Sequence, residues 1–132
     1  MPLLTKFPNI ELAVMAILDR DIVALTNKSG TELPKNQPLP YVRVFRVPGG
    51  RRNRLKDYPW VDIEVFAEGA TGKSLMEDID AVIFGYPEGV AVGDQFVKIE
   101  DVQVRASLGQ RPWTDDRVRR YGATYQLTVS RS

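Results

Sequence analysis

The sequence contains neither cysteine nor histidine among its 132 residues. Without cysteine there is no disulfide, no thiolate nucleophile and no zinc–thiolate site. Without histidine the chain lacks the usual general base near neutral pH, the commonest metal ligand and the partner of a catalytic serine. We therefore expect no catalytic, cofactor-binding or metal-binding residues, and we predict that the protein is not an enzyme.

Long hydrophobic runs are also missing. No apolar stretch approaches the ~20 residues that a membrane-spanning helix needs, and the first residues lack the basic flank and apolar core of a signal peptide. A composition of 43% hydrophobic and 27% charged residues is typical of a globular protein. We expect a single domain over residues 1–132, with long loops at about 27–40, 48–59 and 109–119, in a cytoplasm-like compartment.

The net charge is only +1, but the two signs are separated along the chain. Residues 43–56 hold six basic side chains and no acid, whereas residues 57–100 hold ten acids against two lysines. The chain becomes basic again after residue 101. Separated signs allow one copy to meet another, basic patch against acidic patch. The alternative is that each charge run is a solvated face.

Two segments have the periodicity of amphipathic helices. The first follows Asn9, an expected N-cap, and its apolar stripe is Ile10, Ala13, Val14, Ile17 and Leu18. The second begins near Thr71, also an expected N-cap, and its stripe is Leu75, Ile79, Val82 and Ile83. Residues 85–89 should end it. The first helix carries further apolar residues off its stripe, which fit either a second partner or a wide stripe inside one core.

Four segments have the composition or alternation of strands. Residues 41–47 are β-branched and aromatic, and the Pro-Gly-Gly of 48–50 should end that strand. Residues 60–67 alternate strictly, with apolar Val61, Ile63 and Val65 opposite Asp62 and Glu64. Residues 96–108 and 121–130 alternate in the same way. The order α-β-β-α-β-β predicts an α+β fold, with two helices packed on one face of a four-stranded, mainly antiparallel sheet.

Residues 67–74 (AEGATGKS) resemble a phosphate-binding loop between a strand and a helix. In such a loop Lys73 would reach the phosphates and Ser74 would hold Mg²⁺. The match lacks the first glycine, and the strand alternation indicates an antiparallel sheet instead of the parallel βαβ units of that fold. We interpret the motif as a strand-to-helix turn, and titration with ATP or GTP and Mg²⁺ separates the two readings.

The order and spacing of several motifs resemble the tail terminator proteins of siphophages, particularly those of actinobacterial phages. The central strand, residues 58–67 (YPWVDIEVFA), is similar to the family's own, as is the preceding strand and glycine turn at 44–50 (VFRVPGG). The helix at 75–84, the opening at 2–8 (PLLTKFP) and the end at 111–129 (RPWTDDRVRRYGATYQLTV) also match. The resemblance spans nearly the whole chain.

The resemblance implies a structural virion protein without an active site, cofactor or membrane contact. Tail terminators form a ring, typically a hexamer, at the head-proximal end of the tail tube, where they stop tube polymerisation and face the neck. The implied partners are other copies of the chain, the major tail tube protein and a neck or stopper protein, with DNA only in transit through the pore. Alternatives are another head–tail connector, a small nucleotide-binding protein, or a nucleic-acid-binding module that uses the arginine-rich segment.

The separation of charges predicts which residues would join neighbouring subunits, because in a closed ring a surface patch of one subunit contacts a different patch of the next. The candidates combine the basic region, the acidic region and the basic tail. They are Arg46, Arg51, Arg52, Arg54, Lys56, Glu64, Glu68, Glu77, Asp78, Asp80, Arg117 and Arg119.

Overall fold

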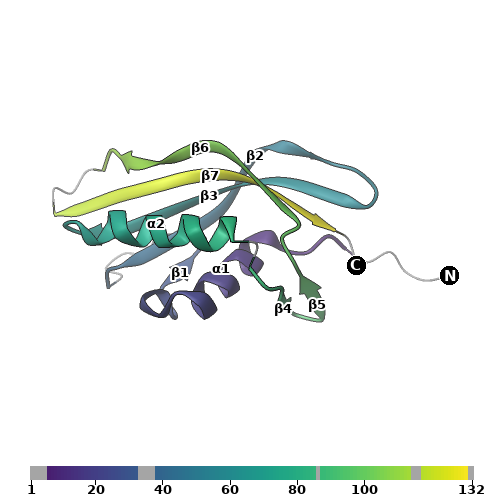
Figure 1. The fold of residues 1–132 in the computed structure, drawn as a ribbon, viewed down its shortest axis with the longest axis horizontal. Helices are drawn as coiled ribbons and strands as arrows, with labels where there is room; N and C mark the ends of the chain where they lie inside the picture. The colour runs from purple at the N-terminus through teal and green to yellow at the C-terminus, as the bar shows by residue number, and fades with distance from the viewer. Residues whose placement is uncertain (1–5, 33–37, 86, 114–116, 131–132) are drawn as a thin grey trace.

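A computed structural model describes residues 6–32, 38–85, 87–113 and 117–130 of the chain. Its elements, in order, are α1 (Ile10–Asp21), a short 3-10 helix η1 (Val23–Leu25), β1 (Ser29–Gly30), β2 (Tyr41–Arg52), β3 (Lys56–Glu68), α2 (Thr71–Phe84), β4 (Val90–Val92), β5 (Gln95–Val97), β6 (Asp101–Arg111) and β7 (Val118–Ser130). Figure 1 shows a twisted sheet with α1 and α2 on the same side of it.

The predicted four-stranded, mainly antiparallel sheet with two helices on one face is wrong. The main sheet has five strands in the order β1-β2-β3-β7-β6, and it is mixed because β1 runs parallel to β2. A second sheet pairs β4 with β5. The sequence pattern missed β1 because two residues in a turn-rich segment show no alternation. It merged β5 with β6, which only residues 98–100 separate.

The core lies between the helices and the sheet. The predicted stripe of α1 is confirmed as buried, and the Asn9 side chain caps the helix by accepting a hydrogen bond from the Leu12 N–H at 3.1 Å. The Thr71 cap is wrong: Thr71 is the first helical residue of α2, and Ala70 precedes it without a side-chain cap. Within the described residues, no helix is long and apolar enough to cross a membrane.

The central strands supply the sheet side of the core. Val61, Ile63 and Val65 of β3 face the helices and are fully buried, which confirms their predicted face. Tyr125 and Leu127 of β7 lie beside them and are equally buried. These β-branched, aromatic and leucine side chains pack against the two helices and exclude water from the space between helices and sheet.

The alternation predicted for residues 102–108 is broken in the structure. β6 is bulged after Val104 and again after Ala106, so its register against β7 shifts twice. Val102 is buried, Val104 is exposed although it precedes the first bulge on the edge strand, and Ala106 beyond that bulge is also exposed. A bulge inserts an unpaired residue and turns the following side chains to the other face.

The hairpin of β2 and β3 corrects the loop expected at 48–59. Both strands continue through that segment and meet in a turn at residues 53–55, and the hairpin projects beyond the helices at the right of Figure 1. We call residues 46–60 the hairpin arm. The Pro-Gly-Gly of 48–50 does not end the strand because it forms a bulge, with a register shift between Val47 and Gly50 and positive φ angles at Gly49 and Gly50.

We expect Gly50→Ala to destabilise the protein more than Gly93→Ala. Both glycines have positive φ angles, 76° and 62°, so each substitution costs about 1–2 kcal/mol of backbone strain. A Cβ at Gly50 would also lie 2.1 Å from the Tyr58 carbonyl oxygen, whereas a Cβ at Gly93 meets nothing within 4 Å among the described residues. Urea unfolding of both variants measures the difference. Equal losses would contradict the steric role of Gly50.

Candidate functional site

The outer face of the sheet, opposite the helices, carries buried acids, among them Glu64, a predicted interface residue. Asp62 and Glu64 project from β3 onto this face, and Glu64 has 0% of its surface exposed. A buried carboxylate is costly unless cations and hydrogen bonds compensate it. Its neighbours therefore decide what this face is.

Three arginines surround Glu64. Arg43 of β2 reaches one carboxylate oxygen, with its Nε 2.9 Å from Oε1. Arg111 from the end of β6 and Arg120 of β7 share the other oxygen, with Nη1 of Arg111 and Nε of Arg120 lying 2.8 and 2.6 Å from Oε2. Glu64 thus joins strands β2, β6 and β7 to β3 through one carboxylate.

Asp62 lies beside it and accepts a bidentate pair of hydrogen bonds from Arg111, at 2.6 and 2.8 Å. The Thr124 hydroxyl of β7 donates a third, at 2.7 Å. The hydrogen bonds to Asp62, followed by those to Glu64, raise the pKa of Arg111 even though its partial burial acts in the opposite direction. We call Arg43, Asp62, Glu64, Arg111, Arg120 and Thr124 the arginine–carboxylate cluster.

Aromatic rings cover the cluster. Phe66 and Trp113 meet edge to face with centroids 4.9 Å apart, and the Arg120 guanidinium lies 5.7 Å from the Trp113 ring centroid. Arg43 stacks over Phe45 at 4.9 Å. The rings limit the access of water, which strengthens the ion pairs beneath them.

A glycine makes room for the cluster. A Cβ at Gly122 would lie 2.7 Å from Cζ of Arg111, so the guanidinium can lie flat on β7 only because this position has no side chain. The sequence interpretation missed this glycine, together with Arg43, Asp62, Arg111 and Arg120. The cross-strand register contains the signal that was needed, because Arg43 stands opposite Glu64 and Thr124 opposite Asp62.

A second cluster of ion pairs stabilises the hairpin arm on the face of the sheet that carries the helices. Asp57 is buried and accepts hydrogen bonds from Arg46 at 2.8 and 3.0 Å and from Arg52 at 2.9 Å. Burial alone would raise the pKa of Asp57, but the hydrogen bonds from Arg52 and Arg46 outweigh it and lower the pKa. Arg52 also lies over the Phe7 ring at 4.5 Å, which ties the arm to the segment before α1.

The twelve predicted interface residues do not gather at one site. Hydrogen bonds or ion pairs within the chain hold Arg46, Arg52, Lys56, Glu64 and Asp80, the last of which accepts a hydrogen bond from the Tyr125 hydroxyl. The other candidates are exposed: Arg51, Arg54, Glu68, Glu77, Asp78, Arg117 and Arg119. Among them, Arg51 stacks over the Tyr58 ring at 4.6 Å. Arg51 and Arg54 lie near the tip of the hairpin arm, and Glu68, Glu77 and Asp78 lie at or near α2. Their role between subunits stays a prediction.

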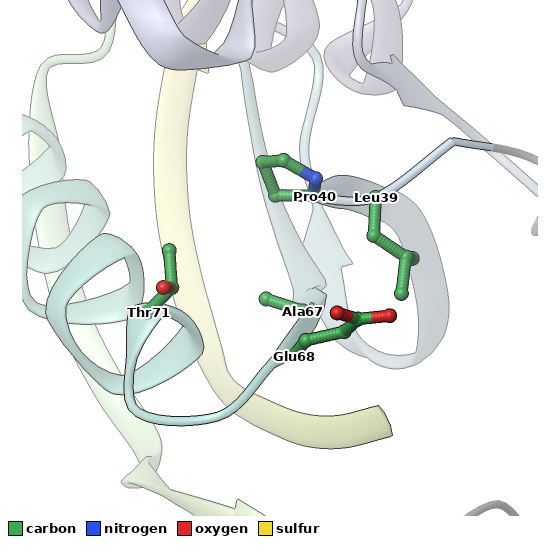
Figure 2. A pocket seen from close by; sticks show the side chains of 5 residues that line it. All are labelled: Leu39, Pro40, Ala67, Glu68 and Thr71. Carbon is green, nitrogen blue, oxygen red and sulfur yellow. The ribbon is translucent and has the colours of Figure 1, made fainter. Parts of the chain in front are cut away.

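The turn at residues 67–74, which resembles a phosphate-binding loop, borders a pocket of about 440 Å³. Figure 2 shows its lining, Leu39, Pro40, Ala67, Glu68 and Thr71, with the Glu68 carboxylate near Leu39. The lining residues offer one carboxylate, one hydroxyl and apolar groups but no cation, which does not suit a phosphate. β3, which leads into the turn, also has antiparallel neighbours on both sides, unlike the parallel strand of a P-loop domain.

The described residues bring no group of three or more acidic, cysteine or histidine side chains close enough to hold a metal ion. The polar side chains of the arginine–carboxylate cluster bind one another. Their arrangement holds four strands together and leaves a surface of three arginines, each about one-quarter exposed, against two anions.

Comparison with known proteins identifies a shared fold. No family model and no curated protein matches the chain. Among solved structures, it is similar to a chain from the virion of a native gene transfer agent (GTA) particle, with a TM-score of 0.62 and 15% sequence identity. The match covers 92% of this chain and 94% of the other. At this identity the likeness shows the fold alone.

We expect Glu64→Gln to destabilise the protein by about 3 kcal/mol, because removal of one charge from a buried ion cluster leaves its partners uncompensated. The arginines are about one-quarter exposed, which holds the cost near the lower end of the range for buried pairs. Glu68→Gln, at the exposed end of the same strand, is the matched control and should change stability by less than about 0.5 kcal/mol. Equal effects in urea unfolding would show that the cluster does not stabilise the fold.

Proposed function

We propose that this protein is a structural subunit of a phage-like virion, and that it is the tail terminator of a siphophage-type tail. In this role its copies close into a ring, a homohexamer, at the head-proximal end of the tail tube. The ring stops polymerisation of the tube and joins the tail to the neck and head. We expect no enzymatic activity from a protein in this role.

The observation that carries the proposal is the fold shared with a chain of the gene transfer agent virion across nearly the full length of both chains. The resemblance of residues 58–67 and 111–129 to tail terminators supports the same class of particle. These residues include most of β3 and β7, which form the centre of the sheet. The proposed partners are other copies of this chain, the major tail tube protein and a neck or stopper protein, with DNA in transit.

The distribution of the exposed charges suits a ring. Arg51 and Arg54 lie at the hairpin arm, whereas Glu68 is the last residue of β3 and Asp78 lies midway along α2. In Figure 1 the tip of the arm and the start of α2 lie at opposite ends of the molecule. Opposite charges at opposite ends favour contacts in which one patch meets a different patch of the next copy. Such head-to-tail contacts close into a ring when the rotation between copies permits.

The mass of the purified protein in solution tests this proposal. Light scattering after size exclusion should give about six times the 14.9 kDa of one chain. A chain that remains monomeric at every concentration would contradict self-assembly. A defined dimer would contradict the ring while leaving a virion role for another head–tail connector.

Reversal of the exposed arm charges that form no ion pair with another described residue should weaken this assembly. The structure selects Arg51→Glu with Arg54→Glu, because Arg52 and Lys56 pair within their own chain and their replacement would also disturb the fold. Lys98→Glu, an exposed lysine outside the arm, is the matched control and should assemble normally. An unchanged ring in the double variant would remove the arm from the subunit interface.

A further inference from the structure

The turn of the hairpin arm displays an apolar side chain without a cover. Leu55 is 66% exposed at the tip. The Asn53 side chain holds the turn by accepting hydrogen bonds from the N–H groups of Leu55 and Lys56 at 2.9 and 2.8 Å, and the Asn53 N–H donates to the Lys56 carbonyl at 2.9 Å. Because the turn is fixed in advance, an anchor at Leu55 loses little conformational freedom on binding.

A groove with apolar walls, which could receive an apolar side chain such as Leu55, lies on the helix layer. It has a volume of about 490 Å³, and its apolar walls include Val23 of η1 with Leu75 and Val82 of α2. Val23 is 87% exposed, which makes it the most exposed of the large hydrophobic side chains in the described part of the chain. Two carboxylates, Asp21 and Asp78, lie on the rim.

The charges of the two surfaces are complementary. Arg54 stands next to Leu55 and is exposed, and Asp78 at the groove is also exposed and makes no ion pair or hydrogen bond with another described residue. Asp21, by contrast, is held by Arg20 at 2.7 Å. A leucine seated in the groove would bring Arg54 to a rim that carries a free carboxylate.

We infer that the tip of the hairpin arm, residues 53–55, docks into the groove between η1 and α2 of a second copy of this chain, with Leu55 as the apolar anchor and Arg54 paired to Asp78. This inference rests on the proposed self-assembly and names the contact that produces it. One contact would cover two exposed hydrophobic side chains that the single chain leaves in water.

The contact cannot form within one chain. β3 has 13 residues and spans roughly 40 Å at ~3.3 Å per residue from the tip to the start of α2. α2 then runs back from that end, and the groove residues lie along its middle and last part. Figure 1 places the tip and the η1 end of α1 on opposite sides of the molecule. Tip and groove therefore belong to different copies, and each copy offers one of each, which is the geometry of a ring or filament.

Cysteine cross-linking tests the docking directly, because the natural chain has no cysteine to interfere. A disulfide needs Cα atoms within about 7 Å. We expect the double variant Leu55→Cys with Val23→Cys to yield a ladder of covalent oligomers on mild oxidation. A mixture of the two single variants should yield dimers and nothing larger, and each single variant alone should yield none.

The matched control replaces the groove position with a distant one. Phe96 is as exposed as Leu55, at 66%, but lies on β5 outside the groove. Leu55→Cys with Phe96→Cys should cross-link at least tenfold less than the groove pair. Comparable cross-linking of the two pairs would overturn the docking.

The outcomes separate the docking from the proposed function. If the unmodified chain forms a ring but the groove pair does not cross-link, the docking is wrong and the ring stands. If the unmodified chain is monomeric, both are wrong.

A charge-swap experiment tests the proposed ion pair separately. Arg54→Glu should lose assembly, and Arg54→Glu combined with Asp78→Arg should regain it. A double variant that assembles no better than the single one would overturn the proposed ion pair.

Discussion

The compensation of two buried acids on β3 is the interaction on which the sheet depends. Asp62 and Glu64 have no helix above them, yet they are removed from water because arginines from β2, β6 and β7 close over them. The same strand buries Val61, Ile63 and Val65 on its other face. One strand is thus held by ion pairs on one side and by apolar packing on the other, and it positions everything attached to its ends.

Those ends are the parts with a proposed role in assembly. β3 begins at the turn of the hairpin arm, which the Asp57 cluster and the Phe7 contact of Arg52 hold against the rest of the chain. It ends beside α2, which forms one wall of the groove that would receive the arm of another copy. A rigid strand between the two surfaces fixes their separation, and a closed ring requires a fixed geometry in each subunit.

Sequence patterns predicted the parts of the fold that periodicity controls. The stripe of α1, the Asn9 cap and the inward face of β3 follow from local spacing and are confirmed. The patterns failed where tertiary pairing decides: β1 is two residues long, and the Pro-Gly-Gly at 48–50 bulges a strand that local rules would end. They also failed at the cluster, because Arg43, Arg111 and Arg120 lie on three different strands and meet at Glu64 only through the register of the sheet.

The subunit presents an apolar tip at its hairpin arm and an apolar groove on its helix layer. We propose that such subunits close into a ring that can pass DNA. Negative-stain electron microscopy of the purified chain tests this proposal. We expect uniform closed rings with a central hole wide enough for duplex DNA. Open filaments, solid particles or isolated single chains across the concentration range would contradict it.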